Sequence, residues 1–131
     1  MFRRLAAVLL IVAGLATTTA SAAIQTYSGV GEYFMTTETV DFAKHEAELA
    51  AERYILERVS VYVREQASMT DHELDEAEII TISAGILRVT DTKFQIEDDA
   101  EGLRVKAFVT AEIDTDELAA LLERATKDRR P

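Results

Sequence analysis

A long run without glycine or proline, residues 40 to about 66, is the feature that most constrains how this chain folds. Within the run an apolar residue recurs at every fourth position, so these side chains share one face of an α-helix. Lys44 and Glu52 belong to the opposite, charged face. The run therefore predicts a long amphipathic helix whose contact face is small at its start and bulky toward its end. The recurring residues are Ala43, Ala47, Ala51, Ile55, Val59 and Val63.

A regular alternation of apolar and polar side chains marks residues 103–113 as the clearest strand in the chain. A polar segment, residues 98–102, separates it from residues 87–96, whose apolar side chains change phase between Thr90 and Lys93. We expect these segments to form an antiparallel hairpin with one face on the core and a bulge or short break in its first strand.

Three further segments complete the predicted order β-α-α-β-β-α. Residues 24–34, rich in aromatic and β-branched side chains, predict a first strand. Thr70 and Glu73 match a capping box, so we expect a second helix from there to about residue 83, and residues 114–117 open a final helix. The expected buried residues are Leu74, Ala77, Ile80 and Ala84 in the second helix, which Gly85 ends, and Leu118, Leu121 and Leu122 in the final helix.

The length of the chain, 131 residues, fits one domain with one modest core. We expect an α+β fold in which a three-stranded, largely antiparallel sheet packs against the long helix. This single domain would span residues 23–126, and a frayed basic tail would follow at residues 127–131.

The N-terminus has the pattern of a cleavable signal peptide, residues 1–22. Two arginines precede an uncharged apolar stretch, residues 5–16, and residues 20–22 (Ala-Ser-Ala) have the small-x-small form that a signal peptidase reads. We expect cleavage before Ala23 and a periplasmic or secreted mature protein without a membrane span. The alternative is an uncleaved anchor, although the apolar stretch is shorter than the ~20 residues of a spanning helix.

Charge and cysteine content narrow the function classes. Cleavage would remove two arginines and no acidic residue, so the formal net charge would change from −10 to −12. A charge this negative disfavours binding to nucleic acids and to anionic lipid surfaces. The chain has no cysteine, which excludes disulfides, thiol catalysis and lipid attachment through a cysteine.

No grouping of residues predicts an enzyme or a bound cofactor. His45, beside charged neighbours on the long helix, and His72, in the capping-box segment, are interpreted as surface residues. Gly29 and Gly31 form a Gly-x-Gly pair, but Phe34 occupies the place of the third glycine of a dinucleotide fingerprint. We expect the two glycines to let the long helix approach the first strand closely.

Five residues form a candidate interaction surface. Tyr27 and Tyr33 share one side of the first strand, and Phe108 points to the polar face of the last strand, together with Arg104 and Lys106. Aromatic and arginine side chains are enriched at protein interfaces. Two alternatives stay open: this face of the sheet is free to meet a partner, or helices cover it.

An acidic segment supports an alternative function, the binding of a cation or small cationic ligand. No basic residue lies between Glu65 and Ile86 to balance it. None of the acidic segments matches an EF-hand loop, so no metal ligand is assigned. The acidic residues of this segment are Asp71, Glu73, Asp75, Glu76 and Glu78.

Small-residue motifs suggest a family resemblance. They are Gly29-Val30-Gly31-Glu32-Tyr33, then Phe42-Ala43-Lys44 with Ala47, Ala50 and Ala51, then Ala84-Gly85-Ile86-Leu87 before the hairpin. Over about residues 24–122 the chain resembles the amino-terminal domain of the flagellar assembly protein FlgT and related small periplasmic proteins of unknown function. The resemblance implies a periplasmic, non-enzymatic module that assembles with other proteins. We therefore expect a small exported interaction module whose partners are periplasmic or envelope proteins.

Overall fold

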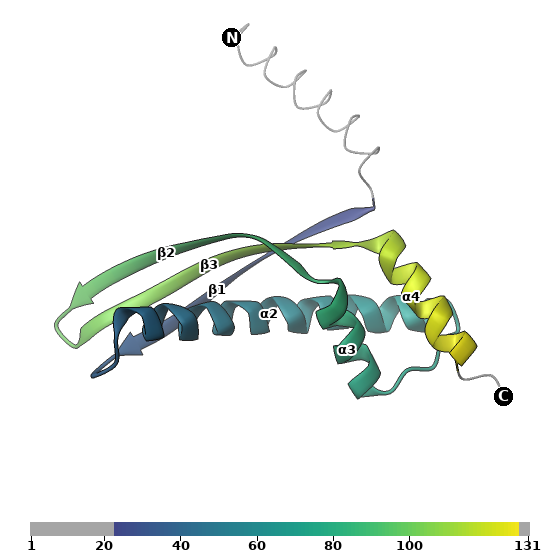
Figure 1. The fold of residues 1–131 in the computed structure, drawn as a ribbon, viewed down its shortest axis with the longest axis horizontal. Helices are drawn as coiled ribbons and strands as arrows, with labels where there is room; N and C mark the ends of the chain where they lie inside the picture. Colours follow the sequence, from purple (N-terminus) through teal and green to yellow (C-terminus); the bar gives the residue numbers. More distant parts are fainter. Residues whose placement is uncertain (1–22, 129–131) are drawn as a thin grey trace, which may run out of the picture.

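The computed structural model describes residues 23–128 and confirms the α+β fold and the order β-α-α-β-β-α (Figure 1). It has two layers, an antiparallel three-stranded sheet and the long helix α2 (Val40–Met69), which runs along one face of the sheet. Two shorter helices, α3 (Glu76–Ile86) and α4 (Thr115–Asp128), lie together at one end of the molecule. The predicted signal peptide, residues 1–22, lies outside the described residues.

The sheet has the order β1-β3-β2, and both outer strands are antiparallel to the central strand β3 (Gly102–Asp114). β1 (Ile24–Met35) pairs with β3 along its whole length. β2 (Arg88–Asp99) pairs with β3 with a register shift at Thr90, which is the bulge predicted from the change of apolar phase. The Thr90 hydroxyl donates to the carbonyl oxygen of Thr110 at 3.2 Å and ties the bulge to the central strand.

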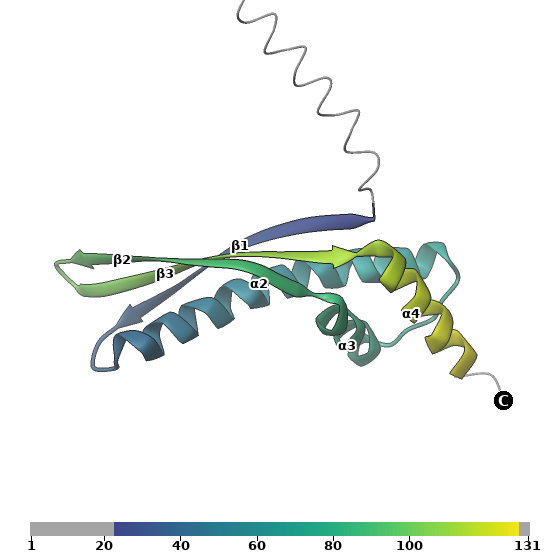
Figure 2. The ribbon, with the colours of Figure 1, turned by 45° about the horizontal axis from the view of Figure 1, so that its top comes forward.

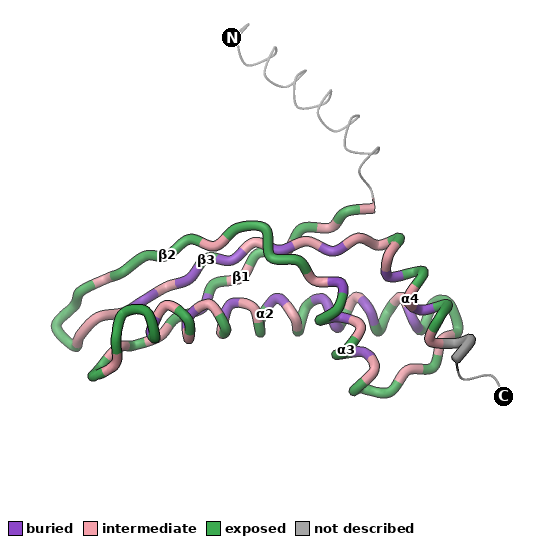
Figure 3. Tube along the Cα trace, viewed as in Figure 1, coloured by how far each residue is buried: buried purple, intermediate pink, exposed green. Residues whose placement is uncertain are grey.

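The core lies between β3 and α2, and both predicted patterns are confirmed (Figure 3). α2 begins after Thr39, whose hydroxyl accepts the Phe42 N–H at 3.2 Å as an N-cap. The helix runs past its predicted end at about residue 66 to Met69, so its buried stripe gains Ala67. The buried apolar residues are Val105, Ala107, Val109, Ala111 and Ile113 on β3, and Ala43, Ala47, Ala51, Ile55, Val59, Val63 and Ala67 on α2.

Gly29 and Gly31 bring the backbone of β1 against α2, as the sequence predicts. A Cβ at Gly31 would overlap the carbonyl oxygen of Ala47, and a Cβ at Gly29 would lie 2.8 Å from the carbonyl oxygen of Ala51. Only glycine permits this separation of strand and helix, because any side chain would have to displace helix backbone.

The predicted start of α3 is wrong, because Thr70 ends α2 instead of capping the next helix. The His72 N–H donates to the carbonyl oxygen of Ala67 at 2.8 Å, and the Asp71 N–H donates to that of Ser68 at 3.3 Å. These bonds form a Schellman motif, in which Asp71 takes the left-handed position with a φ of 58°.

Asp75 and Glu78 form the capping box of α3. The Glu78 N–H donates to Oδ1 of Asp75 at 2.8 Å, and the Asp75 N–H donates to Oε1 of Glu78 at 3.2 Å. The buried face of α3 also differs from the predicted one: Ile79, Ser83 and Ile86 are buried, Leu74 is partly buried, and Ala77, Ile80 and Ala84 are exposed. α3 continues through Gly85, which therefore does not end the helix.

α4 buries Leu118 and Leu122 as predicted, and Leu121 is partly buried. α4 extends to residue 128, two residues into the segment predicted to be a frayed tail, and residues 129–131 lie outside the described part of the chain. None of the helices in residues 23–128 is long and apolar enough to cross a bilayer.

Candidate functional site

The five residues predicted to form one interaction surface lie on opposite faces of the sheet. Tyr27 is paired with Ala111, and Tyr33 is paired with Val105. Both partners are buried core positions of β3, so the two tyrosines face α2 and do not belong to an open surface. The other three predicted residues, Arg104, Lys106 and Phe108, lie on the face that no described helix covers (Figure 2).

Both tyrosines help to pack α2 against β1. The Arg58 guanidinium lies over the Tyr27 ring, 5.3 Å from the ring centroid, and donates to the carbonyl oxygen of Ser28 at 2.8 Å. Burial is the main cause that raises the pKa of Tyr27 above 10.0. Tyr33 packs edge-on against Phe42, with ring centroids 5.7 Å apart. The rings therefore serve the contact between the two layers.

Glu38 organises the turn between β1 and α2. Its carboxylate accepts the Tyr33 hydroxyl at 3.0 Å and the N–H groups of Thr36 and Thr37 at 3.0 and 3.2 Å. Backbone hydrogen bonds, the one from Thr36 first, lower the pKa of Glu38 from 4.5 to about 2. The lowered pKa of Glu38 is therefore explained by the structural role of its carboxylate in the turn.

The uncovered face combines an apolar pair with a row of charges. Phe108 is 39% exposed, and Val30, directly opposite on β1, is 46% exposed. The next residue of β3 on the same face, Lys106, lies between two acids on the neighbouring strands. Its Nζ is 3.6 Å from Oε1 of Glu32 and 3.4 Å from Oε1 of Glu97. This arrangement gives an apolar centre bordered by charge, as at many protein interfaces.

A second aromatic ring on this face lies beside the charged row. Phe34, which is 36% exposed, is paired with Arg104, whose guanidinium is 3.7 Å from the carboxylate of Asp99. The sequence interpretation missed Phe34 and Val30. The signal was present in the alternation of β1, because residues between the tyrosines and glycines of that strand must point to the other face.

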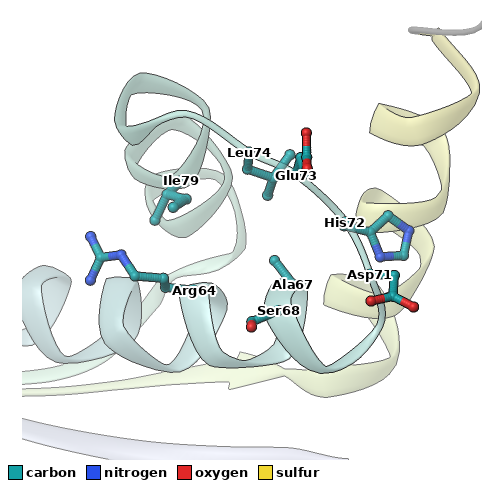
Figure 4. A pocket seen from close by; sticks show the side chains of 8 residues that line it. All are labelled: Arg64, Ala67, Ser68, Asp71, His72, Glu73, Leu74 and Ile79. Atoms are coloured by element: carbon teal, nitrogen blue, oxygen red, sulfur yellow. The ribbon is translucent and has the colours of Figure 1, made fainter.

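A hollow of about 710 Å³ lies where the end of α2 meets α3 and the loop between them (Figure 4). Asp71, His72 and Glu73 line it from the loop. Arg64 lines it from α2 and pairs with Glu76 at 2.7 Å, so one acid of the predicted cluster is neutralised. Two further acids of the cluster form the capping box of α3.

One of the two histidines, His45, lies at the surface as the sequence predicts, whereas His72 is half-buried. His45 is exposed on α2, and Nδ1 of the half-buried His72 lies 2.6 Å from the hydroxyl oxygen of Thr70. Among residues 23–128, no three histidine or acidic side chains gather in a way that would hold a metal ion.

A groove of about 400 Å³ runs between α2, the end of α3 and the start of β2, because α2 packs mainly against β1 and β3. Leu49 and Leu56 from the helix and Val89 from the strand line it. Further along the same side of β2, Phe94 and Ile96 are 38% and 45% exposed. β2 therefore carries exposed apolar side chains even on the face that is turned toward the helix layer.

No protein-family model matches the chain, and a comparison with curated proteins finds no match. The resemblance to the FlgT amino-terminal domain, which rests on small-residue motifs, remains a prediction. The functional proposals below rest on the geometry of the described residues.

Proposed function

We propose that this chain is a small exported protein-interaction or assembly module without catalytic activity, and that it binds its partner through the uncovered face of the sheet. The observation that supports this most directly is the exposed pair Val30 and Phe108 at neighbouring positions on that face. Large apolar side chains at the centre of a polar rim are typical binding hot spots. The FlgT-like motifs favour the same class of protein.

The charges around the apolar pair limit the chemistry of the partner. Lys106 is shared by Glu32 and Glu97, so this row carries more acid than base. A partner that places an apolar side chain on Phe108 and a basic side chain near the two glutamates would complement it. We expect this partner to be another periplasmic or envelope protein.

Export is part of the proposal, and cleavage before Ala23 is compatible with the fold. The carbonyl oxygen of Ala23 accepts the Thr115 N–H at 2.6 Å and the Thr115 hydroxyl at 3.0 Å, so the chain is held by α4 from its first described residue. N-terminal sequencing of the protein recovered from the periplasm should begin at Ala23. A protein that keeps Met1 and fractionates with membranes would contradict cleavage.

Affinity capture from an envelope extract tests the interaction surface. The chain from Ala23 onward is the bait, and Phe108→Ser is expected to lower retention of its partner at least about tenfold. Tyr54→Ser is the matched control, because Tyr54 is 59% exposed on α2 and lies off the uncovered face. A partner retained equally by both variants would place the interface elsewhere, and a bait that retains no protein would refute the proposal.

A further inference from the structure

The outer edge of β2 is the more open of the two sheet edges. β2 and β1 are the outer strands, and each has one unpaired edge within the described sheet. On β1, the Arg58 guanidinium already occupies the carbonyl oxygen of Ser28. On β2, nearly every residue is exposed (Figure 3). An exposed strand edge offers unpaired N–H and C=O groups to another strand.

The regularly paired part of β2 has one residue at its midpoint. The bulge at Thr90 ends regular pairing on one side, and the hairpin turn at Ala100 ends it on the other. Between them, residues 91–99 form an uninterrupted strand with Gln95 at its midpoint. Two such segments placed antiparallel about Gln95 would therefore pair along their whole regular length.

The side chains match in this register. Directly opposite residues would be Lys93 with Glu97 of the second copy, on the outer face, and Phe94 with Ile96 of the second copy, on the helix side. The two-fold axis repeats both pairs. Opposite charges and aromatic–β-branched pairs at directly opposed positions are the favourable cross-strand combinations. The pairing would also cover Phe94 and Ile96, which are 38% and 45% exposed in one copy.

Neighbouring registers match less well. Centring the pairing on Phe94 would place Asp91 opposite Glu97, and centring it on Ile96 would place Phe94 opposite Asp98. In the Gln95 register the one repulsive pair is Asp91 with Asp99, at the two ends. Asp99 already has a cation on its own chain, the Arg104 guanidinium at 3.7 Å.

We propose that two copies of this chain pair through their β2 edges, antiparallel about Gln95, to form one continuous sheet. Both α2 helices then lie on the same face, and the exposed apolar side chains of the two β2 strands meet between them. The interface is isologous, so it closes on itself and gives a dimer instead of a fibre. The dimer does not rest on the proposed function, because it uses the edge of β2 and leaves Phe108 open.

Complementary charge variants test this register. In Lys93→Glu and in Glu97→Lys, the dimer would face two like-charge pairs, so each variant alone should raise the dimer dissociation constant by roughly tenfold or more. Mixing the two variants restores opposite charges at both pairs and should restore the dimer. Glu57→Lys, an exposed charge change on α2, should leave it intact.

Sedimentation equilibrium of the chain from Ala23 onward gives the readout, with circular dichroism to verify that each variant is folded. The expected result is a dimer for the wild type, for Glu57→Lys and for the mixture, and a monomer for each single β2 variant. A monomeric wild type overturns the proposal. This includes the case in which the β2 edge binds a different protein, so that the β2 amides are protected from hydrogen exchange only when that protein is added. A dimer that ignores both β2 variants overturns it as well.

Discussion

Gly31 of β1 and Ala47 of α2 meet backbone to backbone, with no space for a side chain between them. A methyl group at Gly31 would collide with helix backbone, which cannot move aside as a flexible side chain does. We expect Gly31→Ala to lower the free energy of unfolding by about 3 kcal/mol or more, at the upper end of overpacking effects. Urea unfolding followed by circular dichroism measures it.

Gly85→Ala is the matched control. A Cβ at Gly85 would have no heavy atom within 4 Å, and the residue lies inside α3. This substitution should raise stability by about 0.5–1 kcal/mol, because glycine is a poor helix former. Equal stability of the Gly31→Ala and Gly85→Ala variants would show that strand and helix are not in close contact.

Asp71→Gly should stabilise the domain by about 0.5–1 kcal/mol. Asp71 holds the left-handed position of the Schellman motif, which glycine adopts without steric cost. Asp71→Val should destabilise it, because a β-branched residue tolerates this conformation poorly. Thermal melting of the three proteins should give the order Gly, Asp, Val from most to least stable. Any other order would argue against a left-handed conformation of residue 71 at the C-terminal end of α2.

Asp75→Ala should cost about 1 kcal/mol of stability, because it removes the N-cap of α3. Asp75→Ser keeps an oxygen that accepts the Glu78 N–H, so it should lose much less. Chemical denaturation of the pair isolates the cap from general effects of substitution at this position. A loss of the same size in both variants would mean that the side-chain oxygen does not cap the helix.

Glu38→Gln should lower stability at neutral pH and lose this effect in acid. The folded pKa of about 2 lies below the ordinary 4.5, so the carboxylate stabilises the fold fully above about pH 4.5. The contribution disappears as the pH falls from 4.5 toward 2. Denaturant unfolding of the wild type and of Glu38→Gln across this range should show the two curves converging.

Glu57→Gln serves as the control for that titration, because Glu57 is exposed on α2, far from the β1–α2 turn. Its stability should follow the wild type throughout. A gap between Glu38→Gln and the wild type that stays constant down to pH 2 would show that the turn does not depend on the charge of Glu38.

The strand order and the long helix were predictable because their patterns are local and repeat many times. The alternation along β3 and the four-residue spacing along α2 each extend over many residues, so one residue that departs from the pattern does not change the prediction. The start of α3 was not predictable in the same way. Thr70 with Glu73, and Asp75 with Glu78, both match a capping box, and only the left-handed turn at Asp71 decides between them.

The candidate surface was half predictable. Phe108, Arg104 and Lys106 share a face because they share the phase of one strand. The sequence interpretation assigned the tyrosines of β1 to the same face. The alternation within a strand does not show which of its faces matches a given face of the neighbouring strand. The phase of Tyr27 and Tyr33 is also that of Gly29 and Gly31, so the close approach of the helix already assigned both tyrosines to the covered side.

The placement of α3 and α4 at one end of the molecule makes its resistance to opening uneven (Figure 1). At that end, three helices and the sheet support one another, whereas near the β2–β3 turn α2 is the only helix of residues 23–128 that lies against the strands. Local opening is easiest where fewest buried contacts must break. Amide hydrogen exchange should therefore be fastest at the β2–β3 turn and slowest toward Ile86 and Leu118. We expect unfolding of the domain to begin at the end that carries this turn.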